Sequence, residues 1–154
     1  MKGNNEVIDF LNKVLKMELT AINQYFLHAK MAGNWEYNDY ASKSREESID
    51  EMKHAETLID RVLMLDGIPN LQNLGKLYIG EDLPEMLDCD LRLEMEAIPL
   101  LKEAIICCEQ ARDFVSRDLF SHILEDEEAH VDWIEAQLEQ IEQMGVQNYL
   151  QSQR

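Results

Sequence analysis

Two short segments of the sequence pair a glutamate with a histidine three residues later. They run from Glu51 to His54 and from Glu127 to His130. On an α-helix, side chains three residues apart share one face, so each pair can bind the same metal ion. A short motif also occurs by chance. The two pairs therefore predict a metal site only if further ligands accompany each of them.

A lone glutamate precedes each pair at the same distance along the chain. The separation in sequence between Glu18 and Glu51 equals the separation between Glu94 and Glu127. One constant offset in sequence therefore relates the two sets of three ligands. This spacing predicts two helical hairpins that face each other across a pseudo-twofold axis. Each hairpin supplies a glutamate from its first helix and a Glu-x-x-His pair from its second, and two metal ions can bind between them.

Glutamate and histidine together form a ligand set that suits iron. Carboxylate oxygens favour the ferric state, and one imidazole per metal completes each side, whereas zinc sites more often use fewer ligands or thiolates. We expect no Lys or Arg in phase on the same helix faces to neutralise the carboxylates. The expected chemistry is the oxidation of paired Fe(II) ions by dioxygen or hydrogen peroxide. The six expected metal ligands, which are also the catalytic residues, are Glu18, Glu51, His54, Glu94, Glu127 and His130.

Four long segments show the apolar spacing of helices that can position these ligands. The first two run from about Asn5 to Asn34 and from about Asn38 to Leu65. The third begins at Asp82, an N-cap with Glu85 three residues later, and the fourth runs from about Asp113 to Gly145. The ligands fall in phase with the apolar stripes, so they are expected in the core. The second segment shows this phase with Glu47, Glu51, His54, Leu58, Val62 and Leu65.

The segment from Asp66 to Asp82 is rich in Gly, Pro and Asn and lacks a helical period. A helix of about 27 residues is about 40 Å long, and about 16 extended residues reach about 50 Å. The connection can therefore cross the whole bundle and make the second and third helices parallel. Pro99 predicts a bend in the third helix, and residues 146–154 predict a short final helix. The expected fold is all-α, a single domain over residues 1–154 that forms a four-helix bundle with one long crossover.

The composition limits the classes of partner. The 154 residues are 45% hydrophobic, which suits one folded domain, and 31 acidic against 14 basic residues give a net charge of -17. So acidic a surface repels nucleic acid and anionic membranes and attracts cations. The polar start of the chain and the lack of a long apolar run predict a cytoplasmic protein. Three cysteines without Cys-x-x-Cys spacing, Cys89, Cys107 and Cys108, predict reduced thiols with no disulfide framework or zinc site.

Over essentially its full length the sequence closely resembles the bacterioferritins, the haem-containing branch of the ferritins. The resemblance rests on Met1–Gly3, Ala21–Ala29, Glu51–His54, Pro69–Gln72 and Asn148–Gln151. It implies a ferritin-like homo-oligomer, a hollow shell of twenty-four copies built from twofold dimers, that oxidises ferrous iron and stores the ferric mineral inside. It also implies haem b between paired subunits and a small ferredoxin that supplies electrons for iron release.

The resemblance extends to two further kinds of site residue. Met52 matches the haem ligand, and its helix face, which carries Ile49 and Ile59, is apolar and turned away from the metal stripe. Some members carry a histidine at the position of Glu46, where it helps to hold an extra iron ion. Glu46 departs from that pattern but still offers a carboxylate. The accessory iron ligands expected here are therefore Glu46, Asp50 and Asp126.

Two other functions fit the same residues. A rubrerythrin-like di-iron peroxidase shares the ligand set, since a fold does not fix a function, although the absence of Cys-x-x-Cys pairs argues against it. A non-catalytic helical interaction bundle would carry the carboxylates incidentally.

His28 and His122 lack a glutamate three residues before them and are expected at the surface or an interface. The aromatic residues expected to pack are Tyr25, Trp35 and Trp133, with radical quenching near the iron as the alternative role.

Overall fold

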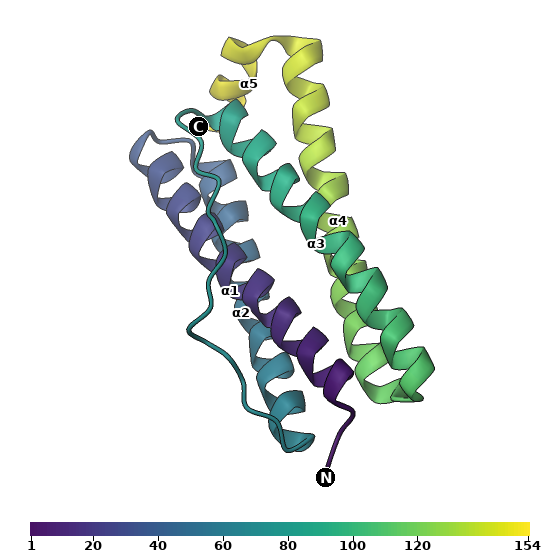
Figure 1. Cartoon of the computed structure of the whole chain (residues 1–154). Helices are drawn as coiled ribbons and strands as arrows, with labels where there is room; N and C mark the ends of the chain where they lie inside the picture. Colours follow the sequence, from purple (N-terminus) through teal and green to yellow (C-terminus); the bar gives the residue numbers. More distant parts are fainter.

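The computed structural model, which describes all residues from Met1 to Arg154, contains only helices and their connections (Figure 1). The helices are α1 (Asn5–Asn34), α2 (Asn38–Met64), α3 (Leu83–Ala111), α4 (Phe114–Met144) and α5 (Val146–Ser152). α1 and α2 form one antiparallel pair, α3 and α4 form the other, and α5 lies at the end of the bundle where α4 finishes (Figure 1). The predicted four-helix bundle with a short C-terminal helix is confirmed.

Polar caps set where the helices begin. Asn4 accepts hydrogen bonds from two backbone N–H groups at the start of α1. Asp82 accepts a hydrogen bond from the N–H of Glu85 in α3, and Asp113 accepts one from the N–H of Ser116 in α4. Each cap satisfies a donor that the first helical turn leaves free. α3 continues through Pro99 as one helix, and the bend expected there stays a prediction.

The connection from α2 to α3 runs along the outside of the bundle, from one end of the bundle to the other (Figure 1). α2 and α3 are therefore parallel, as predicted. Polar side chains of α1 hydrogen-bond to the backbone of this connection. The pairs are Asn12 with Ile68, Thr20 with Gly75, Gln24 with Tyr78 and His28 with Gly80. At Gly80 a Cβ would lie 2.4 Å from the backbone nitrogen of Met86, so only glycine allows the connection to approach α3 this closely.

Two apolar clusters fill the bundle, one toward each end. The first includes Leu11, Leu58 and Phe120, and the second includes Tyr40 and Ile134. Between them lies a buried layer of glutamate and histidine side chains. The two clusters hold the four helices at fixed spacing on both sides of that layer, and so position its charged groups. No helix is both long enough and apolar enough to cross a membrane.

Candidate metal centre

All six predicted metal ligands meet in the middle of the bundle, and none is more than 6% exposed. Each of the four long helices contributes at least one of them. They are Glu18 from α1, Glu51 and His54 from α2, Glu94 from α3, and Glu127 and His130 from α4. Because the six ligands come from positions spread along most of the chain, the arrangement is a property of the folded bundle.

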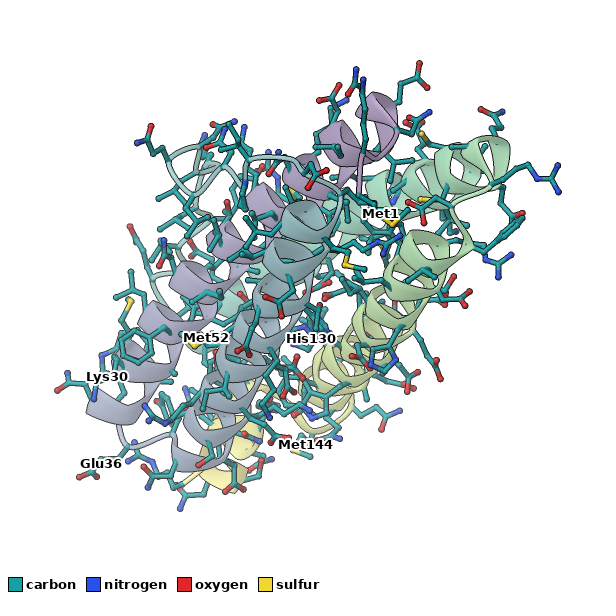
Figure 2. The ribbon with its side chains drawn as sticks, turned by 90° about the horizontal axis from the view of Figure 1, so that it is seen from below. Met1, Lys30, Glu36, Met52, His130 and Met144 are labelled. Atoms are coloured by element: carbon teal, nitrogen blue, oxygen red, sulfur yellow. The ribbon has the colours of Figure 1, made fainter.

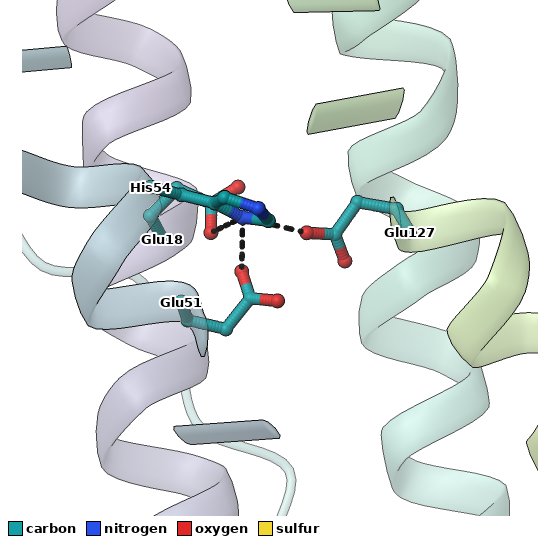
Figure 3. Close-up of side chains that lie close together, drawn as sticks. All are labelled: Glu18, Glu51, His54 and Glu127. Carbon is teal, nitrogen blue, oxygen red and sulfur yellow. Dashed lines mark ion pairs between the residues drawn. The ribbon is translucent and has the colours of Figure 1, made fainter. Parts of the chain in front are cut away.

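Three carboxylates surround one nitrogen of His54 (Figure 3). Its Nδ1 lies 3.4 Å from Glu18 Oε2, 3.4 Å from Glu127 Oε1 and 3.6 Å from Glu51 Oε2. The ligand atoms of these four residues all lie within 4.8 Å of one another. One metal ion could contact all of them with small side-chain adjustments, since a divalent metal such as zinc binds oxygen and nitrogen ligands at about 2 Å.

A second group lies beside the first and shares Glu127 with it. Its ligand atoms come from Glu94, Glu127 and His130 and also lie within 4.8 Å of one another. His130 Nδ1 is 3.1 Å from Glu94 Oε1, and the hydroxyl of Tyr25 donates a hydrogen bond to the same oxygen. The two groups correspond to the two half-sites that the offset in sequence predicts, with Glu127 placed to bridge them.

Unsatisfied polar atoms support metal binding at this position. Four buried side-chain atoms have no hydrogen-bond partner, and all four belong to the predicted ligands. They are Glu18 Oε2, His54 Nδ1, Glu94 Oε2 and Glu127 Oε1. Buried polar atoms are almost always paired, because leaving one unpaired is costly. A pair of cations between the two groups would satisfy all four atoms, so the residues fit a di-metal site.

The same crowding changes how the ligands bind protons. Burial raises the pKa of Glu18, and burial followed by the nearby Glu127 charge raises the pKa of Glu94. Burial alone would lower the pKa of His54, but the Glu127 and Glu18 carboxylates outweigh it and raise that pKa to about 11. The metal-free centre therefore retains protons at neutral pH, and metal ions must displace them.

Metal binding is expected to release protons and to stabilise the protein more at high pH than at low pH. A group whose pKa is higher in the folded than in the unfolded chain contributes stability to the metal-free protein at pH values below its unfolded pKa. This contribution is lost as the pH rises, toward about 11 for His54. Co(II) replaces the protons, so saturating Co(II) should raise the melting temperature by about 5 to 10 °C at about pH 8. The increase should be smaller at about pH 5.5. An equal increase at both values would contradict the proton displacement.

A cleft of about 610 Å³ opens between α2 and α4 and reaches the centre, with Glu51, His54 and His130 in its lining. Two predicted accessory residues, Asp50 and Asp126, also line this cleft, whereas Glu46 is exposed and lies outside the lining. Asp126 has a contact that the sequence did not predict. Its Oδ2 accepts a hydrogen bond of 2.8 Å from His54 Nε2, which turns His54 Nδ1 toward the centre.

A second buried polar group, which no motif in the sequence predicts, surrounds His28, and the surface or interface position expected for His28 is wrong. His28 is 0% exposed. Its Nδ1 donates to Asp90 over 2.8 Å, and its Nε2 accepts from the backbone of Gly80 over 3.0 Å. Asp90 also accepts hydrogen bonds from Gln24 and Tyr40. These partners are far apart in the sequence and form no short motif. This group holds the crossover connection against α1, α2 and α3.

The expected surface position of His122 and the expected packing of three aromatic side chains are confirmed. The side chain of His122 is 74% exposed. Tyr25 packs edge-on against the His130 ring and Trp133 stacks on it, with ring centres 5.1 Å and 6.2 Å away, while Trp35 packs against Tyr37. All three cysteines are free thiols, and the two most buried are Cys107 and Cys108.

Met52 lies on the outer face of the α1–α2 pair. In Figure 2, Met52 and His130 lie on opposite sides of α2. Met52 is 59% exposed, and Ile49 beside it is 43% exposed. A groove of about 480 Å³ adjoins Met52. Its apolar lining includes Leu19, Ile22, Ile59, Leu71 and Leu74. An exposed thioether at the edge of an apolar groove fits a flat apolar cofactor such as haem.

Known proteins resemble this chain over nearly its whole length. The family model of the ferritin-like domain matches residues 8–144. A bacterioferritin of Mycolicibacterium paratuberculosis is 49% identical, over 97% of this chain and 94% of the relative. A bacterioferritin of Streptomyces coelicolor is 47% identical over 97% and 90% of the two chains, and one of Rhodobacter capsulatus is 46% identical over 97% and 92%. These matches agree with the four-helix bundle.

Proposed function

The chain belongs to the bacterioferritin family of ferritin-like proteins, and we propose that it stores iron by oxidising Fe(II) at the buried centre. The observation that carries this proposal is the set of unpaired buried atoms on Glu18, His54, Glu94 and Glu127. The substrate would be Fe(II), and the product would be a ferric mineral enclosed by a shell of many copies.

The charges of the centre suit two Fe(II) ions. The four glutamates carry four negative charges, which equal the positive charge of the two ions, so the loaded centre is neutral in its apolar surroundings. Each ion gives up one electron. Hydrogen peroxide that accepts both electrons, with two protons, becomes two water molecules, and dioxygen becomes hydrogen peroxide. Pairing the ions avoids the release of a one-electron oxygen radical.

The residues of the chain prepare this reaction in distinct ways. Asp126 orients His54 through the hydrogen bond to Nε2, and Tyr25 holds Glu94 through its hydroxyl. The apolar clusters exclude water from the two ends of the ligand layer along the bundle, and the cleft opens to the layer from the side. Oxidised iron would leave along the cleft, where Asp50 and Asp126 offer carboxylates, and Glu46 offers a further carboxylate at the surface. Because Asp126 contacts His54, it contributes to the centre as well as to the cleft.

Haem is the second group that the residues fit. We assign Met52 as its iron ligand, one from each of two subunits on a twofold axis, with the apolar groove beside Met52 holding the ring. When bound, haem supplies a redox centre through which electrons can reach stored ferric iron. A small ferredoxin is the proposed electron donor for iron release.

Size determination combined with metal analysis tests the proposed function. The purified protein, incubated with Fe(II) in air, should elute as a large assembly that carries far more iron than two ions per chain can account for. A non-catalytic interaction bundle would elute as a small oligomer without iron. A rubrerythrin-like peroxidase would retain only its paired metals. Either of the last two results would overturn storage.

A further inference from the structure

The two halves of the centre are chemically unequal at one place. The sequence offset that relates Glu18 to Glu94 pairs every predicted ligand with an identical residue type, but it pairs Glu47 with Ile123 and Lys43 with Leu119. The last four of these residues all line the cleft. One half of the centre therefore has a carboxylate and an ammonium group at the cleft, where the other half has two aliphatic side chains.

Glu47 lies between the cleft and the His130 half of the centre. One oxygen, Oε1, is 3.1 Å from Lys43 Nζ, and the other, Oε2, is 3.7 Å from His130 Nδ1. Lys43 therefore does lie in phase with the ligand face of α2, and the expectation that no lysine does so is wrong. Glu94 approaches the same nitrogen from within the centre, at 3.1 Å. The metal-facing nitrogen of His130 thus has one carboxylate on its buried side and a second on the side of the cleft.

A simple ion pair between Glu47 and Lys43, one turn apart on α2, does not explain this arrangement. The carboxylate of an ordinary surface pair stays in water, and such a pair adds little stability. Glu47 is only 8% exposed, and Lys43 is held over the Trp133 ring at 5.5 Å. Burying a carboxylate with one oxygen directed at a histidine of the centre costs free energy, which a cation on the His130 side would offset.

We propose that Glu47 is a seventh ligand, which binds the iron ion on the His130 side and transfers it between the centre and the cleft. Lys43 neutralises part of the Glu47 charge, so that this contact stays weak enough to exchange. The His54 half has only Ile123 at the equivalent position, so its ion has no ligand of this kind on the side of the cleft. The proposal rests on the function proposed above and identifies the half through which iron moves.

Titration of the metal-free protein with Co(II), without oxygen, tests the ligand assignment apart from activity. The wild type should bind about two Co(II) ions per chain in the centre. Glu47→Gln keeps the size of the side chain. It should lower the affinity for one of these ions about tenfold and leave the affinity for the other unchanged. Glu47→Asp keeps the charge and should recover part of the affinity. Glu128→Gln removes an exposed carboxylate outside the cleft and should bind Co(II) like the wild type.

Repeated additions of Fe(II) test the transfer step. Glu47→Gln should slow the first rapid oxidation at limiting Fe(II), and after a second addition at a fixed interval it should recover a smaller fraction of its own first rapid phase than the wild type recovers. Lys43→Gln should tighten the binding of the Co(II) ion on the His130 side, because it removes the ammonium group that neutralises Glu47. Unchanged Co(II) affinity and full recovery in Glu47→Gln would overturn the proposal. If the wild type itself lacks paired Co(II) binding and a rapid phase, the proposed function fails instead.

Discussion

Replacing Glu51 or Glu127 by alanine is expected to slow the initial oxidation of Fe(II) at least about a hundredfold. Each change removes a buried carboxylate that lies within 4.8 Å of the other ligand atoms around His54. Glu127 should have the larger effect, because it belongs to both groups of ligands. His130→Ala and Glu18→Ala should also slow oxidation strongly. Stopped-flow absorbance after mixing with Fe(II) in air measures the rate.

Loss of activity through misfolding can be separated from loss of the centre. Removing one carboxylate from a buried cluster of like charges relieves repulsion in the metal-free protein. The Glu51→Ala and Glu127→Ala proteins should therefore assemble normally and melt, without metal, at or above the wild-type temperature. Glu128→Ala, which removes an exposed carboxylate from α4, should oxidise Fe(II) at the wild-type rate. Near-normal initial oxidation in Glu51→Ala would refute the assignment of the centre.

Much of the fold follows from local signals in the sequence. The periodic apolar stripes, with Asn4, Asp82 and Asp113 as caps, determine where α1, α3 and α4 begin. The length and composition of the segment between α2 and α3 require a crossover, and the crossover makes those helices parallel. The six ligands could also be predicted, because a ligand in phase with a core stripe must point inward.

The contacts that join distant helices could not be predicted in this way. Asp90 binds His28 across 62 residues of sequence, and Asp126 binds His54 across 72. Neither pair shares a helix, so no period of the sequence relates them. Glu47 appeared only as one member of a helical stripe, and its approach to His130 depends on how α2 and α4 pack. Such contacts arise from tertiary packing, which a single sequence encodes only indirectly.

Replacing Met52 by leucine is expected to abolish haem binding and to leave assembly and Fe(II) oxidation intact. Leucine keeps the apolar character of the groove beside Leu19 and Ile59 but lacks the thioether that binds iron. In a twofold contact each residue of one subunit is matched by the same residue of the other, so two Met52 side chains would hold one haem, at about one haem per two chains. Met95→Leu is the matched control, since Met95 is 49% exposed on α3, away from this groove. Absorbance of the haem-reconstituted proteins measures the content, and full haem with unchanged axial ligation in Met52→Leu would show that another residue binds it.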